Sequence, residues 1–317
     1  MVTNMEFRTL GRTGLRVSRL GLGTAEIGFA YGIGSRTLPS EEDAIRLLRA
    51  AVDIGVTYFD TAYFYGLAEE RIGKSGIAKL PEVIVATKCG QFLEKGEDPR
   101  GQELEQKLRE QVETSLRNLK IDSVSILMLH GGSEEQIKRG ELTELLKKFQ
   151  REGKARFLGI STRGEEAPLA AIESGAFDVI QVAYSILDQR MSKNVLPTAF
   201  ANNIGVVGRS VLLKGALAGL ADSLPQGLDL LRKNSEAARI LADNELNCDL
   251  PTLALRFVFS EPVLSAVLIG TNKIENLQRS ASVAGRNPIS ADVIAILRTL
   301  AIDDPNQVDP AKWPKNV

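Results

Sequence analysis

Eight short apolar runs, each followed by a longer segment of mixed polarity, constrain the fold of this chain more than any other feature. Within the runs, polar and apolar residues do not alternate, which is typical of strands buried on both faces of a parallel sheet. The runs cover residues 18–23, 57–60, 83–88, 124–130, 155–161, 178–184, 204–209 and 264–270.

The segments between the runs have helical patterns. Residues 40–55 begin with Ser40 as an N-cap, carry an acidic residue three positions later and end at Gly55. Residues 103–120 place their leucines and a valine on one stripe. We also expect helices over residues 67–79, 134–152, 165–174, 193–202, 249–260 and 273–285.

Eight strands that alternate with helices predict an α/β fold of the (β/α)8 TIM-barrel type, in a single domain that spans residues 1–317. The alternative is an open, doubly wound sheet, but GLGT at 21–24 lacks the GxGxxG pattern of that fold. Residues before the first barrel strand, with Gly11 and Gly14 at a turn, predict a hairpin. The proline-rich C-terminal tail is expected to be an extended strap beyond extra C-terminal helices.

Composition excludes several classes of function. The net charge of −1 offers no basic surface for nucleic acid or an anionic membrane. No apolar run approaches the length of a membrane span, and the start of the chain lacks the pattern of a signal peptide. Two cysteines suggest a reducing compartment, so we expect a cytoplasmic protein. His130 is the only histidine, which argues against a metal site that needs two.

Three apolar runs end in residues that carry chemistry: Asp60, Lys88 and His130, with Tyr65 in the loop that follows Asp60. Each residue alone has an ordinary explanation, namely a turn carboxylate, a solvated lysine, a core histidine or rim packing. In a barrel, however, active sites lie at the carboxyl ends of the strands, and neighbouring strands are about 4.8 Å apart. We therefore expect the four side chains to meet at one rim.

Such a group of side chains would make a proton donor for a carbonyl oxygen. A phenol has a pKa of about 10, which a neighbouring ammonium group lowers. A carboxylate would hold Lys88 in place, and an imidazole would orient the carbonyl. Because no activated serine or cysteine stands at this rim, a hydride from a cofactor is the natural nucleophile.

Three motifs carry a resemblance to the aldo-keto reductase superfamily. DTAYFYGLAEERIGK matches the family signature, VATKCG the strand that ends in the active-site lysine, and LMLHGG the strand that ends in the histidine. The resemblance extends from LGRTGLRVSRLGLGT to VLIGTNKIENLQ. It implies a barrel plugged by an N-terminal hairpin, reversible carbonyl reduction, and Tyr65 as proton donor with Asp60, Lys88 and His130 as its partners.

The resemblance also implies a nicotinamide dinucleotide site. Four matched positions depart from the family pattern, with Thr162 for asparagine, Arg209 for a stacking aromatic, Val211 for proline and Asn272 for arginine. The implied contacts are Gly23, Thr24, Asp60, Ser161, Gln181, Arg209, Ser210, Leu212, Gly270, Thr271, Asn272 and Lys273.

The sequence thus predicts an NADP(H)-dependent aldo-keto reductase, with NAD(H) also possible, that acts on a small carbonyl or alcohol, including sugars. We expect no metal. Two alternatives remain: a cofactor-binding regulatory subunit with the same fold, and a Schiff-base lyase that uses Lys88. The substrate depends on the loops at 26–39, 90–101 and 214–234 and on the tail, and neither it nor the oligomeric state can be predicted.

Overall fold

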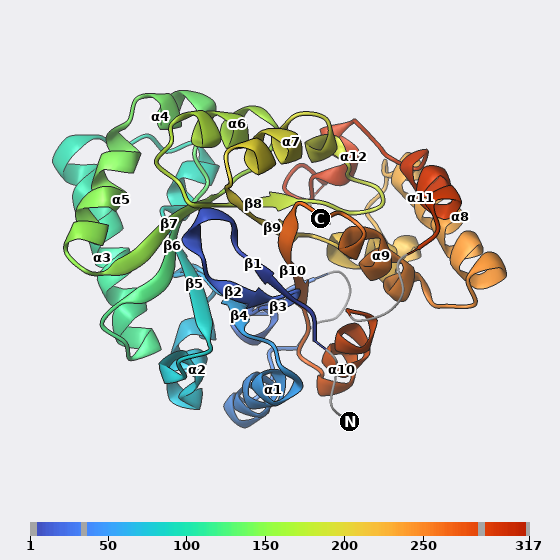
Figure 1. The fold of residues 1–317 in the computed structure, drawn as a ribbon, viewed down its shortest axis with the longest axis horizontal. Coiled ribbons are helices and arrows are strands. Elements are labelled where there is room, and N and C mark those ends of the chain that lie inside the picture. Colours follow the sequence, from blue (N-terminus) through green and yellow to red (C-terminus); the bar gives the residue numbers. More distant parts are fainter. Residues whose placement is uncertain (1–4, 33–36, 285–288, 315–317) are drawn as a thin grey trace.

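The computed structural model describes residues 5–32, 37–284 and 289–314. In this part of the chain, eight parallel strands form a closed barrel with helices packed around it (Figure 1). The predicted (β/α)8 barrel is therefore confirmed. The barrel strands are β3 (Leu20–Gly23), β4 (Tyr58–Asp60), β5 (Ile84–Cys89), β6 (Val124–His130), β7 (Ala155–Ser161), β8 (Val179–Ala183), β9 (Gly205–Arg209) and β10 (Leu264–Gly270).

The barrel closes between its first and last strands. On one side β3 pairs with β4, with Gly23 opposite Asp60, and on the other side it pairs with β10, with Gly23 opposite Gly270. The helices of the described chain are α1 (Glu41–Ile54), α2 (Ala68–Ser75), α3 (Gly101–Leu119), α4 (Glu134–Lys138), α5 (Glu141–Arg151), α6 (Glu166–Glu173), α7 (Val195–Ala201), α8 (Asp229–Glu245), α9 (Leu250–Phe259), α10 (Ile274–Val283), α11 (Ala291–Arg298) and α12 (Pro305–Val308).

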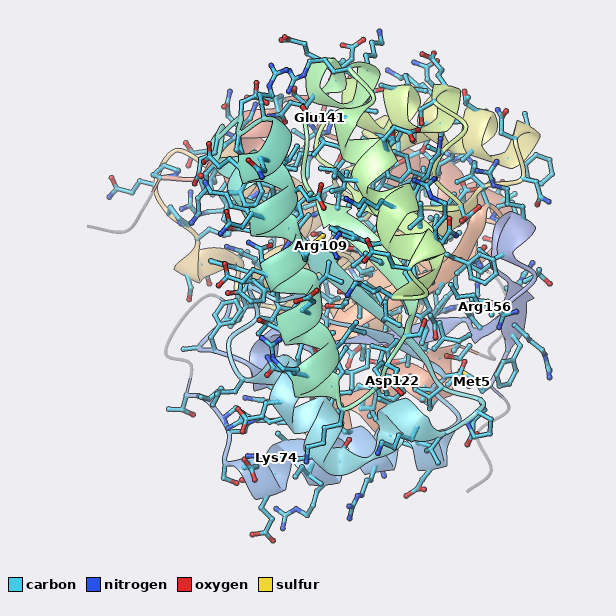
Figure 2. All side chains as sticks on the ribbon, turned by 90° about the vertical axis from the view of Figure 1, so that its left-hand side faces the viewer. Met5, Lys74, Arg109, Asp122, Glu141 and Arg156 are labelled. Atoms are coloured by element: carbon cyan, nitrogen blue, oxygen red, sulfur yellow. The ribbon has the colours of Figure 1, made fainter. Side chains whose placement is uncertain are left out.

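The signals for α1 and α3 act as the sequence predicts. The Ser40 hydroxyl accepts a hydrogen bond from the backbone N–H of Asp43, and Gly55 ends α1 in a left-handed conformation. The apolar stripe of α3 is buried, whereas its other face carries charged side chains (Figure 2). There Arg109 joins α3 to the end of α5 through an ion pair of 2.7 Å with Glu152.

The structure differs from the sequence prediction in four segments. The helix expected over residues 134–152 is two helices, α4 and α5, because Gly140 between them has a left-handed φ of 80°. Residues 229–234, which we expected in a loop, form the start of α8. Extra C-terminal helices were expected, but the sequence analysis gave no range for α11. The tail is not wholly extended, since Asp304 caps the short helix α12.

A hairpin of β1 (Phe7–Thr9) and β2 (Arg16–Ser18) closes one end of the barrel, and Figure 1 shows it in dark blue across the middle of the ring. Leu10 and Val17 are fully buried in one cluster with the residues that fill the barrel interior. At the turn, Gly11 has a φ of 47°, and a Cβ there would lie 2.2 Å from the backbone nitrogen of Gly205. The close packing of the plug therefore requires glycine at this position.

The barrel interior determines where polar side chains can gather. Tyr58, Ala86 and Met128 belong to the interior apolar cluster. Because side chains alternate along a strand, the next inward position of each strand is two residues later. Those positions are Asp60, Lys88 and His130, at the carboxyl ends of β4, β5 and β6.

Within the described residues, no helix has the length and apolarity that crossing a membrane requires.

Candidate active site

Polar residues occupy inward positions at or near the carboxyl ends of six successive strands. Since the inward rows below them are apolar, these side chains form a polar layer on top of the packed barrel core, opposite the hairpin plug. The members of this layer are Asp60, Lys88, His130, Ser161, Gln181 and Arg209.

Lys88 lies at the centre of the layer and has no solvent exposure. Its ammonium group donates hydrogen bonds to a carboxylate oxygen of Asp60 at 2.7 Å and to the carbonyl oxygen of Thr61 at 2.9 Å. A third hydrogen bond, of 3.4 Å, reaches the hydroxyl of Tyr65. All three N–H groups therefore have acceptors, and the charge of Lys88 faces Tyr65 on one side and Asp60 on the other.

Asp60 has a second partner that the sequence analysis did not anticipate. The side-chain amide of Gln181 donates to the other carboxylate oxygen of Asp60 at 2.6 Å. The hydroxyl of Ser161 donates to the amide oxygen of Gln181 at 3.0 Å. A continuous hydrogen-bonded chain therefore runs from Ser161 through Gln181 and Asp60 to Lys88 and Tyr65.

Tyr65 reaches this layer from the loop between β4 and α2. A turn brings its ring back over the strand ends, because its backbone N–H donates to the carbonyl oxygen of Ala62 at 2.9 Å. Its ring meets the His130 ring edge to face, with centroids 5.7 Å apart. The four side chains predicted to meet at one rim lie together in the structure.

The electrostatics of the site follow from burial and from the charge of Lys88. Burial raises the pKa of the Tyr65 phenol, and Lys88 opposes this rise. Burial also lowers the pKa of Lys88, but the attraction of Asp60 and Tyr65 outweighs it, so this pKa is raised. The pKa of His130 lies well below its ordinary value because of burial and the nearby cations Lys88 and Arg209. At neutral pH, Tyr65 is therefore protonated, Lys88 charged and His130 neutral.

A cavity of about 420 Å³ opens above Tyr65 and His130. Gly23 and Gly270, at the ends of β3 and β10, line it without side chains. From there it continues to Lys273 and Asn276, at the start of α10. Thr24 lies beside this path, but its hydroxyl is buried and donates to the carbonyl oxygen of Asp60 at 2.9 Å.

The far end of the cavity contains the residues predicted for a dinucleotide phosphate. Thr271, Asn272 and Lys273 line it, and the hydroxyl of Thr271 accepts a hydrogen bond from the N–H of Lys273 at 3.1 Å. Arg279, the other nearby basic residue in the sequence, forms an ion pair of 3.1 Å with Asp249 outside the cavity. Lys273 is therefore the cation that this end of the cavity offers among the described residues.

The loop after β9 forms one wall of the cavity. Ser210, Leu213 and Lys214 have left-handed backbones with φ values of 61°, 43° and 54°. Non-glycine residues rarely adopt this conformation, and strained backbone of this kind clusters at binding sites. A cavity of this size, lined by the polar side chains of Ser161 and Gln181, by a strained loop and by Lys273, fits a nicotinamide dinucleotide.

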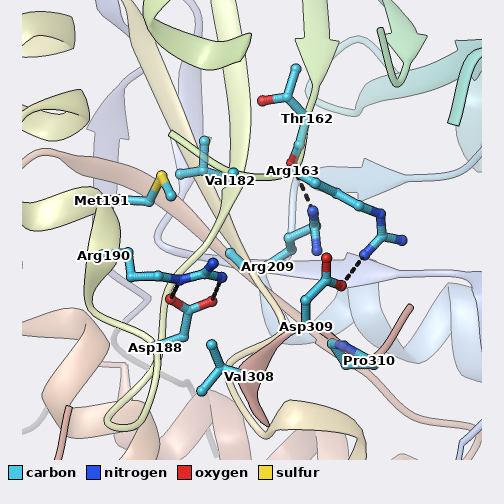
Figure 3. Close-up of a pocket in the computed structure, with 12 residues that line it drawn as sticks. Thr162, Arg163, Val182, Asp188, Arg190, Met191, Arg209, Val308, Asp309 and Pro310 are labelled. Carbon is cyan, nitrogen blue, oxygen red and sulfur yellow. Dashed lines mark hydrogen bonds and ion pairs between the residues drawn. The ribbon is translucent and has the colours of Figure 1, made fainter. Parts of the chain in front are cut away.

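The sequence analysis missed charged residues that line the same cavity as Tyr65, namely Glu94 and Arg163. Arg163 forms ion pairs with Glu94 at 3.3 Å and with Asp309 of the tail at 2.6 Å. Figure 3 shows the pair of Arg163 and Asp309, with Arg209 beside it bonded to the carbonyl oxygen of Thr162. The only indication of this in the sequence was that Arg163 directly follows the matched segment at 159–162.

In the described ranges, no group of acidic residues, cysteines and histidine could hold a metal ion.

Comparison with known proteins agrees with the fold. Residues 19–302 match the family model described as the Aldo/keto reductase family. The chain is 30% identical to L-galactose dehydrogenase of Arabidopsis thaliana, over 100% of this chain and 99% of that protein. It is 29% identical to NADH-specific methylglyoxal reductase of Escherichia coli, over 92% and 97%.

A solved structure gives the same result. The holo form of the aldo-keto reductase AKR11C1 from Bacillus halodurans superimposes with a TM-score of 0.79 at 26% identity, over 98% of this chain and 100% of that one. This chain therefore belongs to the aldo/keto reductase family of oxidoreductases. The fold and family predicted from the sequence are both confirmed.

Proposed function

We propose that this protein is a nicotinamide-dependent enzyme that reversibly reduces an aldehyde or a ketone to an alcohol, with Tyr65 as the proton donor. The observation that carries the proposal is the contact of 3.4 Å between the Tyr65 hydroxyl and the ammonium group of Lys88, which Asp60 holds from the other side. A buried phenol beside a fixed ammonium can give up its proton, because the tyrosinate that forms is stabilised by that charge.

Each residue has a defined task in this proposal. Neutral His130 donates a hydrogen bond that orients the carbonyl oxygen toward Tyr65. Tyr65 transfers its proton to that oxygen as the alcohol forms, and Lys88 stabilises the resulting phenolate. Gln181 and Asp60 hold Lys88 in position, since their hydrogen bonds fix the carboxylate. A bound dinucleotide supplies the hydride. In alcohol oxidation the proton returns to Tyr65.

We further propose that the dinucleotide occupies this cavity, with its carboxamide near Ser161 and Gln181. Arg209, Ser210 and Leu212 would contact it along the β9 loop, and the residues from Gly270 to Lys273 would contact its far end. Gly23, which has no side chain, would leave room for the dinucleotide at the rim of the barrel. Thr24 is not exposed to this cavity, so its part is to support the Asp60 backbone.

For the choice of cofactor, we propose that NADPH is preferred by a small factor and that NADH is usable. Lys273 provides one positive charge for a 2′-phosphate. Asn272 stands where an arginine would bind that phosphate with two hydrogen bonds. The use of NADH has a precedent in the E. coli relative, which is described as NADH-specific.

Two alternatives are less well supported. A Schiff-base lyase requires an accessible, uncharged lysine, whereas Lys88 is fully buried and uses its three N–H groups on acceptors. A regulatory subunit would keep the cofactor site without needing the catalytic side chains, yet all four are in contact here. Both alternatives predict that the purified protein does not oxidise NADPH or NADH when carbonyl compounds are added.

The test is an assay of the purified protein with a panel of aldehydes, ketones and sugars, followed by the absorbance of the reduced cofactor at about 340 nm. We expect turnover of at least one class of carbonyl with either NADPH or NADH, and the reverse reaction with the matching alcohol. Binding of both cofactors with no turnover across the panel would instead support a regulatory role.

A further inference from the structure

A buried carboxylate in the signature segment has no task in the proposed mechanism. Glu69 lies in the first turn of α2 and is 1% exposed, whereas its neighbour Glu70 reaches solvent and pairs with Lys74 at 2.5 Å. Burial raises the pKa of Glu69, because a charged carboxylate loses its hydration there. A group that is costly to bury needs a specific partner inside the protein.

The partner of Glu69 is Thr87 on β5. The Thr87 hydroxyl donates a hydrogen bond to the carboxylate oxygen Oε1 of Glu69, and this bond opposes the rise in the pKa of Glu69. Because side chains alternate along a strand, Thr87 points toward the surrounding helices, and the next residue, Lys88, points into the barrel. The hydrogen bond therefore attaches α2 to β5 one residue before the lysine.

The same turn of α2 is attached to Tyr65. The carbonyl oxygen of Tyr65 accepts a hydrogen bond of 3.0 Å from the backbone N–H of Ala68, the first residue of α2. The loop after β3 also packs against this carbonyl, since a Cβ on Gly28 would lie 1.7 Å from its oxygen. The position of α2 therefore influences how far the Tyr65 hydroxyl lies from Lys88.

Other contacts hold the rest of α2 in place. A Cβ on Gly73 would lie 2.0 Å from the carbonyl oxygen of Asn118, so α2 packs closely against α3. Arg71 donates a hydrogen bond of 2.6 Å to the carbonyl oxygen of Ile27 and joins α2 to the loop after β3. The hydrogen bond of Glu69 adds a different connection, because it joins α2 to the strand that carries Lys88.

From this geometry we propose that Glu69 and Thr87 are positioning residues of the active site. Their hydrogen bond joins the helix that follows Tyr65 to the strand of Lys88, and it thereby maintains the contact of 3.4 Å between the hydroxyl and the ammonium group. Both residues act from behind the strand, outside the set of side chains that line the cavity. The inference rests on the proposed function, because it concerns the proposed proton donor.

The test measures the pKa of the Tyr65 phenol after this hydrogen bond is removed. Thr87→Val keeps the branched shape of the side chain and removes the donor. When the contact with Lys88 lengthens, the ammonium charge lowers the pKa of Tyr65 less, so we expect this pKa to rise by about one unit. The ultraviolet absorbance of the tyrosinate in the cofactor-free protein gives the pKa without turnover, if each titration is corrected by the same titration after Tyr65→Phe.

The charged and titratable groups that face Tyr65 are unchanged in this variant. They are Lys88 of β5, Asp60 of β4, His130 of β6, Arg209 of β9 and Tyr31 of the loop after β3. Loss of the hydrogen bond favours the protonated form of Glu69, and less negative charge near Tyr65 would lower its pKa. The sign of the shift therefore distinguishes a changed position from a changed charge.

Steady-state rates provide a second readout. Thr87→Val should lower kcat for carbonyl reduction by up to about tenfold, since one pKa unit corresponds to a factor of ten, and should change KM and cofactor binding little. Thr87→Ser keeps the hydroxyl and should behave as wild type. Thr143→Val is the matched control, because it removes a hydroxyl that donates a hydrogen bond of 2.7 Å at α5. It should lower stability without changing kcat or the pKa of Tyr65.

A double variant keeps the test decisive if Thr87→Val folds poorly. Glu69→Met with Thr87→Val replaces both polar partners by apolar groups of similar shape, which is nearly neutral for stability. Its reference is Glu69→Gln, which lacks the charge but keeps an oxygen that accepts a hydrogen bond from Thr87. Relative to this reference, the double variant should have a higher pKa of Tyr65 and a lower kcat.

The outcomes separate this inference from the proposed function. If the pKa of Tyr65 is unchanged or lowered in Thr87→Val, or does not differ between the double variant and Glu69→Gln, the inference is wrong and the proposed function stands. A rise of the same size in Thr143→Val also overturns the inference. If the wild-type protein reduces no member of the carbonyl panel, the proposed function fails, and the pKa of Tyr65 still decides whether Glu69 and Thr87 position this residue.

Discussion

The ammonium group of Lys88 lies 2.7 Å from the carboxylate of Asp60, and both groups are buried at the carboxyl end of the barrel. A buried charge pair of this kind is strongly destabilised when one partner is removed, because the remaining charge has lost its compensation. The same pair also faces the Tyr65 hydroxyl, so it links the stability of the protein to the proposed proton transfer.

Replacing Lys88 should therefore affect both stability and activity. We expect Lys88→Met to lower the free energy of unfolding by about 3–5 kcal/mol and to abolish carbonyl reduction. The double variant Lys88→Met with Asp60→Asn should recover much of the stability but none of the activity. Urea titrations and the pH profile of the rate provide the measurements. A Lys88→Met enzyme with a normal rate and an unchanged pH profile would remove Lys88 from the mechanism.

For the proton donor, Tyr65→Phe should keep cofactor binding and lower kcat for carbonyl reduction by about 10²–10⁴-fold, the usual contribution of general acid catalysis. Tyr63→Phe is the matched control, because it removes a hydroxyl from the same loop and keeps the backbone N–H of Tyr63 that donates to the carbonyl oxygen of Lys88. Steady-state rates and cofactor titration by fluorescence are the measurements. Turnover by Tyr65→Phe within twofold of wild type would show that another group supplies the proton.

Since His130 is the only histidine, its titration can be isolated in the pH dependence of stability. Its folded-state pKa lies well below the ordinary value of 6.5, so below that pH the unfolded chain binds a proton that the folded protein does not. Stability from this group is thus fully present above the ordinary pKa and is lost as the pH falls. We expect the wild-type protein to lose up to about 1.4 kcal/mol per pH unit more than His130→Gln below about pH 6.5. Urea unfolding at several pH values measures this difference, and parallel curves for the two proteins would contradict it.

Cofactor preference should depend on Lys273 alone among the basic residues near α10. We expect wild type to bind NADPH roughly ten- to thirtyfold more tightly than NADH, a difference of about 1–2 kcal/mol. Lys273→Gln should remove most of this difference and leave NADH binding unchanged. Arg279→Gln should leave the preference intact, because Arg279 is paired with Asp249. Titration of both cofactors by the fluorescence of Trp313 and the tyrosines is the measurement. A clear preference of the wild type for NADH would show that Lys273 does not reach the phosphate.

Much of the site could be predicted because strand periodicity is a local property. We predicted from the ends of three apolar runs that Asp60, Lys88 and His130 meet at one rim. In the structure they lie together at the carboxyl ends of β4, β5 and β6. The contact of Gln181 with Asp60 could not be predicted, because it depends on how β8 and β4 face each other across the closed barrel. The same holds for Arg163 and Asp309, which meet only through the path of the tail. Similarly, the start of α8 was assigned to a loop because its first turn follows a segment rich in glycine and proline.

The hydrogen bonds of β3 to both β4 and β10 have a consequence for the chain as it is synthesised. The first barrel strand leaves the ribosome early, but one of its edges has no partner until the last strand has emerged. Until then β3 and β9 both present open sheet edges, which are templates for pairing with other chains. A polypeptide that stops before Leu264 keeps both edges open, and such truncated products should aggregate and depend on chaperones more than the full chain does.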